Sequence, residues 1–279
     1  MRPEKVLIPL TEAEKNSPIA KYYKEQLAPP NMEALGQLLQ GPMDPAKEIY
    51  PDQLDKMYEP GYLEGETGYC ILPNGCGYVA VNNKFPGVTM EMMQWWMAWH
   101  ALEQIRYRIW NPFCHTSIAV ADVDREWITN PDVPLDKKSQ GVVHFVVEDI
   151  GAGPSNILIH FLNHEDMGLD AEKLAASKQT VFGGYGIVSD HCGKSGTFAK
   201  QPVIMMHFCR ETEDGVEFRT RFWMGYRWNK GIPMCVKPEH VQIPEVAPMG
   251  LAIHNVEEYS HLASILPEVY AEFGKDPIK

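Results

Sequence analysis

A run of twenty-one residues without glycine or proline, at positions 90–110, constrains the fold more than any other feature of this sequence. Thr89 precedes the run as a candidate N-cap, and Asn111-Pro112 ends it. Its apolar content is typical of a helix that is buried on most sides. The sequence therefore predicts one long, buried helix over residues 90–110.

Strand-like segments follow this run and are separated mostly by glycine, asparagine or aspartate clusters. They cover residues 116–123, 141–150, 156–162, 180–189, 202–210 and 216–228. A helical pattern at 249–273 ends the chain, with a kink or interruption expected at Pro267. This order predicts an α+β fold, with helices packed on one side of a curved antiparallel sheet. A cavity between the sheet and a long helix would suit a small apolar ligand.

Residues 1–88 are irregular and rich in proline, so we expect a small N-terminal region at 1–88 and a main domain at 89–279. Within the first region, residues 61–81 predict a short hairpin or an arm.

The formal charge of −12 makes nucleic acid an unfavourable partner. No secretory signal and no run of about 20 apolar residues is present, which predicts a soluble cytoplasmic protein without a membrane partner.

Several familiar signatures are incomplete. Gly193-Lys194-Ser195 resembles the end of a P-loop, but Val188 occupies the position of the required earlier glycine. The six cysteines include no CxxC pair, and we expect reduced thiols. His160 and His164 are four residues apart, but on a strand such positions lie too far apart to bind one ion. We interpret both histidines as structural or surface residues.

His254 and Glu258 are also four residues apart, in the helical pattern near the C-terminus. Residues at this spacing project from one face of a helix, so the two side chains can bind one cation. The alternative is a capping box, with Asn255 as the N-cap and Glu258 as its partner.

Two residues outside that helix are further candidates. His115 follows the turn Pro112-Phe-Cys, where the chain must turn inward to begin a strand. Glu148 shares one face of its strand with His144 and Val146, so it either enters the cavity or marks a solvated strand end. A carboxylate inside a cavity requires a compensating positive charge, which a divalent ion supplies. The alternative for His115 is an ordinary core histidine.

Tyr107 lies on the helical stripe that contains Trp96, His100 and Glu103. One interpretation is a buried aromatic stripe with a hydrogen-bonded His100–Glu103 pair. Tyr107, however, is nearest the helix end that leads to His115. Its hydroxyl is therefore the one expected near any metal ion bound there.

Three sequence blocks together resemble the phloretin hydrolase and diacetylphloroglucinol hydrolase family. They are 99–115 (WHALEQIRYRIWNPFCH), 221–226 (RFWMGY) and 254–263 (HNVEEYSHLA). The resemblance implies a Bet v 1-like helix-grip fold and one zinc ion. The implied zinc ligands are His115, Glu148, His254 and Glu258; the implied catalytic or pocket groups are Tyr107, His207 and Tyr226, with Glu148 also helping to deprotonate water.

The resemblance also implies hydrolysis of the carbon–carbon bond between an acyl group and a phloroglucinol ring, in a homodimeric enzyme acting on a small acyl phenol. We expect phloretin, cleaved to phloroglucinol and 3-(4-hydroxyphenyl)propionate, as in flavonoid degradation. The alternatives are deacetylation of a diacetylphloroglucinol, ester or amide hydrolysis, and a non-catalytic module that binds apolar ligands. Such a module would not require the four expected zinc ligands.

Overall fold

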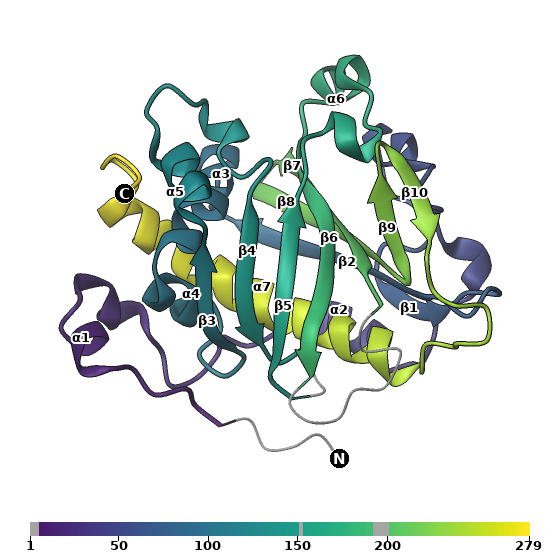
Figure 1. Cartoon of the computed structure of the whole chain (residues 1–279), viewed down its shortest axis with the longest axis horizontal. Helices are drawn as coiled ribbons and strands as arrows, with labels where there is room; N and C mark the ends of the chain where they lie inside the picture. Colours follow the sequence, from purple (N-terminus) through teal and green to yellow (C-terminus); the bar gives the residue numbers. More distant parts are fainter. Residues whose placement is uncertain (1–5, 151–152, 192–200) are drawn as a thin grey trace.

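The computed structural model describes residues 6–150, 153–191 and 201–279. One eight-stranded antiparallel sheet packs against the long C-terminal helix α7 (Val246–Phe273), which crosses behind β4, β5 and β6 in Figure 1. The shorter helices lie mainly around the ends of the sheet. The expected α+β fold, an antiparallel sheet that curves around a long C-terminal helix, is confirmed.

The strands agree well with the segments expected from the sequence. The large sheet has the order β1-β2-β8-β7-β6-β5-β4-β3, and β9 pairs with β10 in a separate hairpin. The last expected segment is divided at Gly225, whose φ of 95° favours glycine. The bounds are β1 Gly68–Ile71, β2 Gly77–Pro86, β3 His115–Val120, β4 Val143–Glu148, β5 Ser155–Phe161, β6 Thr180–His191, β7 Val203–Thr212, β8 Gly215–Met224, β9 Tyr226–Asn229 and β10 Ile232–Cys235.

Strands β1 and β2 come from the proline-rich first part of the chain. The hairpin or arm expected at 61–81 is a hairpin, and β2 pairs with β8 from Gly77↔Met224 to Pro86↔Gly215. Residues 1–88 therefore contribute two strands to the same sheet as residues 89–279. The division of the chain at residue 88 stays a prediction of the sequence.

The helices before α7 are short. The α-helices are α1 Glu12–Lys15, α2 Met32–Leu38, α3 Met90–Trp99, α4 Gln104–Trp110, α5 Asp122–Thr129 and α6 Ala171–Ser177, and the 3-10 helices are η1 Pro18–Tyr22, η2 Pro45–Lys47, η3 Leu54–Tyr58, η4 His100–Leu102, η5 Leu135–Lys137 and η6 Glu165–Met167.

The single helix expected over residues 90–110 is wrong, because the chain leaves helical conformation at Glu103 (φ −145°, ψ 140°). Arginine side chains satisfy the backbone carbonyls that this interruption frees. Arg106 donates to the carbonyl of Trp99 at 3.0 Å, and Arg125 donates to that of Leu102 at 2.7 Å. These side-chain hydrogen bonds remove the usual cost of unpaired carbonyls at a helix end.

Helix α7 begins at Val246, several residues before the pair at 254 and 258. Asn255 is therefore inside the helix, and the capping-box interpretation is wrong. Asn255 instead accepts a hydrogen bond from Asn83 of β2 at 2.8 Å, which joins helix and sheet. Pro267 lies within α7 without ending it.

No helix in the described part of the chain is both long and apolar enough to cross a membrane.

The described cysteines Cys70, Cys76, Cys114, Cys209 and Cys235 are free. Cys192 and the Gly193-Lys194-Ser195 segment lie outside the described residues.

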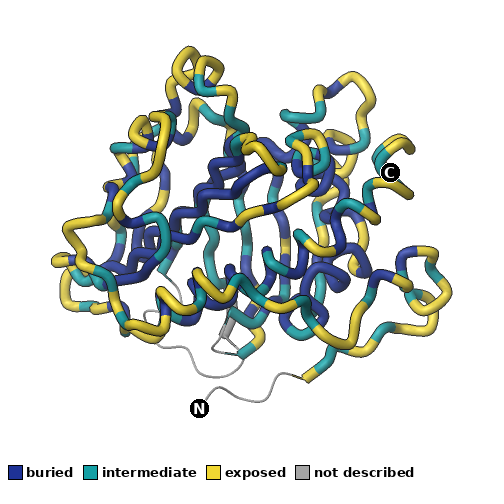
Figure 2. Tube along the Cα trace, turned by 180° about the vertical axis from the view of Figure 1, so that it is seen from behind, coloured by how far each residue is buried: buried dark blue, intermediate teal, exposed yellow. Residues whose placement is uncertain are grey.

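Side chains of β8 alternate between the two faces of the sheet, and a different part of the chain packs against each face. Phe218 packs in the cluster that includes Tyr259 of α7, whereas Trp223 packs with Ile49 and Met57 of the N-terminal region. Figure 2 shows buried positions concentrated in the centre of the molecule and exposed positions in the peripheral loops. The segment from Ile49 to Met57 therefore covers the face of the sheet that points away from α7, whereas α2 and η1 pack on the α7 side.

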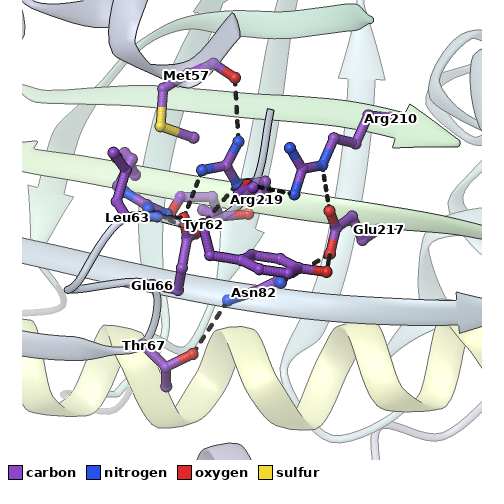
Figure 3. A network of polar contacts seen from close by, with 12 residues as sticks. Met57, Tyr62, Leu63, Glu66, Thr67, Asn82, Arg210, Glu217 and Arg219 are labelled. Carbon is purple, nitrogen blue, oxygen red and sulfur yellow. Dashed lines mark hydrogen bonds and ion pairs between the residues drawn. The ribbon is translucent and has the colours of Figure 1, made fainter. Parts of the chain in front are cut away.

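Buried charges lie on this covered face (Figure 3). Glu66 accepts from Nε and Nη2, along one edge of the Arg219 guanidinium group, and pairs with Arg221 at 2.8 Å. Both arginines are at most 1% exposed. Arg219 also donates to the carbonyl of Met57 at 3.0 Å. Burial opposes ionisation of Glu66, but the two arginines outweigh it and hold its pKa at about 2.

We expect Glu66→Gln to lower the free energy of unfolding by about 3–5 kcal/mol, because it leaves two buried guanidinium groups without their carboxylate. Chemical denaturation at pH 7 measures this. Glu64→Gln is the matched control: Glu64 pairs with Lys47 while 74% exposed, and its loss should change stability by less than about 1 kcal/mol.

The pH dependence gives a second check of the same substitution. The folded pKa of Glu66 lies below its ordinary value of 4.5, so its stabilisation is fully present above pH 4.5 and is lost toward pH 2. The stability difference between wild type and Glu66→Gln should shrink over that interval. A difference that is small at pH 7, or constant with pH, would show that the ion pairs contribute little.

Candidate metal centre

A cavity of about 140 Å³ lies between the sheet and α7. Strands β3 to β8, helix α4 and α7 all contribute to its wall. Most lining side chains are apolar, such as Val146, Ile157 and Phe222. Polar groups in such a wall are largely removed from water, so each requires a specific partner.

Four of these polar groups form one cluster: His115, Glu148, His254 and Glu258. A donor atom from each lies within 4.8 Å of the donor atoms of the others. His115 begins β3 and is the register partner of Glu148 at the end of β4. His254 and Glu258 are one turn apart on α7. Sheet and helix thus each supply one histidine and one carboxylate.

The distances within the cluster are short. Glu148 Oε1 lies 2.7 Å from Nε2 of His254 and 3.6 Å from Nε2 of His115. Glu258 Oε2 lies 3.2 Å from Nε2 of each histidine. Donors bound tetrahedrally to zinc at about 2.0–2.1 Å would be about 3.3 Å apart. The separations therefore fit a single small cation.

The protonation of the cluster also favours a cation. Nδ1 of His115 faces the carbonyl of Tyr107 at 3.0 Å and must donate to it, which leaves Nε2 for a ligand. Burial opposes the charged form of His115, but Glu148 and Glu258 outweigh it and raise its pKa to about 9; the pKa of His254 is also raised by these carboxylates. One divalent ion could replace the two imidazolium protons with the same total charge.

The carboxylates show the complementary effect. Burial alone would raise their pKa values, but His115 and His254 outweigh it and lower the pKa of Glu148 and of Glu258. Both side chains are about 10% exposed. Both are therefore ionised at neutral pH, as cation ligands must be.

Tyr107 lies directly against this cluster. Its ring stacks on His115 with centroids 3.8 Å apart, and its hydroxyl donates to Glu148 Oε2 at 2.8 Å. Burial and then the nearby Glu148 charge raise its pKa well above 10. Tyr107 is therefore a protonated hydrogen-bond donor at neutral pH.

The expected hydrogen bond between His100 and Glu103 is wrong. Glu103 pairs with Arg106, and His100 bonds to the carbonyl of Trp96 instead.

His207 lies in the cavity wall, but Tyr226 does not. Nδ1 of His207 is 2.8 Å from the hydroxyl of Thr220, and burial lowers its pKa to about 3. Tyr226 is in the small β9–β10 sheet, where its hydroxyl accepts from Asn74 at 2.8 Å. The turn at Gly225 separates Tyr226 from the cavity-lining end of β8. The expectation that Tyr226 is a pocket residue is therefore corrected: it lies outside the cavity.

His160 and His164 also lie outside the cluster, as expected, but only His160 is on a strand, because β5 ends at Phe161 and His164 directly precedes η6. His160 stacks on Tyr185, and His164 contacts the carbonyl of Val181 at 3.0 Å. The sequence did not single out Tyr259 as a cavity residue, although it follows Glu258 directly and lines the same wall.

Comparisons with known proteins show the family of this chain. A family model described as the DAPG hydrolase PhiG domain matches residues 49–271. The phloretin hydrolase of Eubacterium ramulus is 34% identical over 277 residues, covering 96% of this chain and 94% of that protein. The 2,4-diacetylphloroglucinol hydrolase of Pseudomonas protegens is 27% identical over 288 residues, covering 97% and 89% respectively.

These matches define a hydrolase. The chain belongs to the DAPG hydrolase family. Among solved structures, Ara h 8.0201 matches with a TM-score of 0.41 and 9% identity over 70% of this chain and 99% of that one. Ginseng major latex-like protein 151 from Panax ginseng has a TM-score of 0.35 and 10% identity over 67% and 99%.

We expect His254→Ala to abolish tight metal binding, because it removes one of four ligands from the cluster. Plasma mass spectrometry of protein dialysed against a weak chelator should give about one ion per wild-type chain and close to none for the variant. His164→Ala is the matched control and should keep its metal. Full metal content in His254→Ala would contradict the proposed site.

Proposed function

We propose that this protein is a zinc-dependent hydrolase that cleaves the carbon–carbon bond between an acyl group and a phloroglucinol ring. The observation that supports this most is the cluster of two histidines and two glutamates inside an apolar cavity, with Tyr107 hydrogen-bonded to one carboxylate. A non-catalytic binding module would have no need to bury four such groups. The names of the relatives support the substrate class.

Zinc suits the proposed ligands His115, Glu148, His254 and Glu258, because nitrogen and oxygen donors at these separations match its preferred coordination. When bound, such an ion supplies Lewis acidity that polarises an acyl oxygen and lowers the pKa of a neighbouring water.

The reaction itself requires water, a stabilised leaving group and one proton transfer. The water oxygen forms a bond to the acyl carbon, and the bond from that carbon to the ring breaks with its electron pair going to the ring. The ring carbon then takes the proton that the water has lost. Ketonisation of a ring phenol makes this cleavage resemble that of a β-diketone.

We propose that Glu148 and Tyr107 transfer the proton from the water to the ring carbon. Tyr107 is protonated and already donates to Glu148, so it can give its proton to the ring carbon and recover one through the carboxylate. Because His115 and His254 lower the pKa of Glu148, this carboxylate would hold the water's proton only transiently. His207 lines the same cavity and is proposed to hold a ring hydroxyl.

Phloretin is the substrate we favour, because the relative named for it is the more similar of the two compared. Deacetylation of a diacetylphloroglucinol is the second candidate, supported by the family match. A homodimeric state and a cytoplasmic location stay predictions of the sequence.

Incubation with phloretin should release phloroglucinol and 3-(4-hydroxyphenyl)propionate without added nucleotide, flavin or oxygen. Chromatography of the products measures this, with chelator-treated protein as the control. If simple phenyl esters are hydrolysed and no acylphloroglucinol is, the protein is an esterase and the proposal fails.

Tyr107→Phe should lower kcat by about 10²–10⁴, because it removes the proposed proton donor and keeps the ring that stacks on His115. Zinc content and melting temperature should hardly change. Steady-state kinetics, metal analysis and thermal unfolding of the same preparation provide the three measurements. A variant with normal zinc and nearly normal kcat would leave Tyr107 only a packing role.

A further inference from the structure

The cavity contains a second polar pair, His100 and His144, which the proposed chemistry does not use. Both are 2% exposed and line the cavity wall, His100 after the end of α3 and His144 on β4. Their rings meet edge to face with centroids 5.4 Å apart. Two adjacent buried histidines in an apolar wall are costly unless a polar partner is present for part of the enzyme's cycle.

The hydrogen bonds of the pair are incomplete. Nδ1 of His100 lies 2.7 Å from the carbonyl of Trp96 and must donate to it, so a neutral His100 presents Nε2 as an acceptor. Nε2 of His144 is buried and has no hydrogen-bond partner among the described residues. Burial lowers the pKa of His100 to about 4 and that of His144 well below 6.5, so both rings are neutral at pH 7.

With its proton on Nε2, neutral His144 is a donor beside the acceptor of His100, and such a pair matches a hydroxyl group better than an ion. A phenolic O–H can donate to Nε2 of His100 and accept from an N–H of His144. A carboxylate would be repelled by the lone pair of His100, and an ammonium group would find no negative charge beside it.

The pair is separated from the metal cluster by about the length of an aryl arm. His100 stacks on Tyr107 with centroids 6.2 Å apart, and Tyr107 in turn stacks on His115 at 3.8 Å. Along β4, His144 precedes Glu148 by four residues, which is about 13 Å of extended strand. Met97, Val146 and Phe161 give the cavity around the pair an apolar wall.

We propose that His100 and His144 form a subsite for a phenolic hydroxyl at the far end of the acyl arm of the substrate. This inference rests on the proposed function and narrows its substrate class to acylphloroglucinols with a hydroxyaryl arm, of which phloretin is one. The acyl carbonyl lies at the metal cluster, and the arm extends past Tyr107 to the two histidines.

Three substrates test the subsite without any mutation. They are phloretin, its analogue that lacks only the hydroxyl of the arm, and 2,4,6-trihydroxyacetophenone, which has no arm. We expect wild type to show a kcat/KM about 10–100-fold lower for the analogue than for phloretin, because the two histidines are then left without their partner. Equal values for phloretin and the analogue would overturn the subsite and leave the proposed function intact.

His144→Phe sharpens the test, because it keeps an aromatic ring against Phe161 and removes the unpaired nitrogen. It should lower kcat/KM for phloretin by about tenfold or more, through KM, and change the other two substrates by less than about threefold. His160→Phe, on a histidine outside the cavity, is the control. Equal loss on all three substrates would mean that His144 has only a structural role.

If wild type cleaves none of the three compounds, the proposed function fails, and binding alone decides the subsite. Quenching of tryptophan fluorescence then gives the Kd of phloretin and of its analogue. Tighter binding of phloretin by about tenfold or more in wild type, lost in His144→Phe, supports the subsite; equal Kd values overturn it.

Discussion

The charges of Glu148 and Glu258 require compensation inside a cavity with mostly apolar walls, and this requirement governs how the site is built. An unpaired carboxylate at either position would be strongly destabilising. Strand β3 and helix α7 each bring a histidine to within 3.6 Å of both carboxylates or closer. Two protonated histidines or one divalent cation would balance the two carboxylate charges equally well. The arrangement that makes these buried charges tolerable therefore also makes the cluster a candidate ligand set.

The interruption of the helix at Glu103 places Tyr107 against this cluster. Because α4 is a separate helix, Tyr107 presents its carbonyl to His115 and its hydroxyl to Glu148. Arg125, from helix α5 outside the cavity, holds one of the carbonyls freed at the interruption. The position of Tyr107, the proposed proton donor, therefore depends on the hydrogen bonds that Arg106 and Arg125 donate outside the cavity.

The sequence predicted the parts of this structure that depend on local periodicity. The strands follow from alternation and turn residues, and the pairing of His254 with Glu258 follows from a spacing of four on one helix. The interruption at Glu103 was not predictable, since no glycine or proline marks it, and the freed carbonyls are bonded by side chains of Arg106 and Arg125 whose contacts the local pattern does not reveal. Tyr226 was misplaced because a single positive φ at Gly225 redirects the chain into another hairpin.

The pairing of β2 with β8 has a consequence for the growing chain. Ala80 and Arg221 are partners although about 140 positions separate them, so the β1–β2 hairpin leaves the ribosome long before its neighbour in the sheet exists. Helix α7, with His254 and Glu258, follows later still. Until β8 is made, β2 has an unpaired edge that favours aggregation. Until α7 is made, the candidate metal site has only His115 and Glu148. The proposed four-ligand site can accordingly form only after α7 has been synthesised.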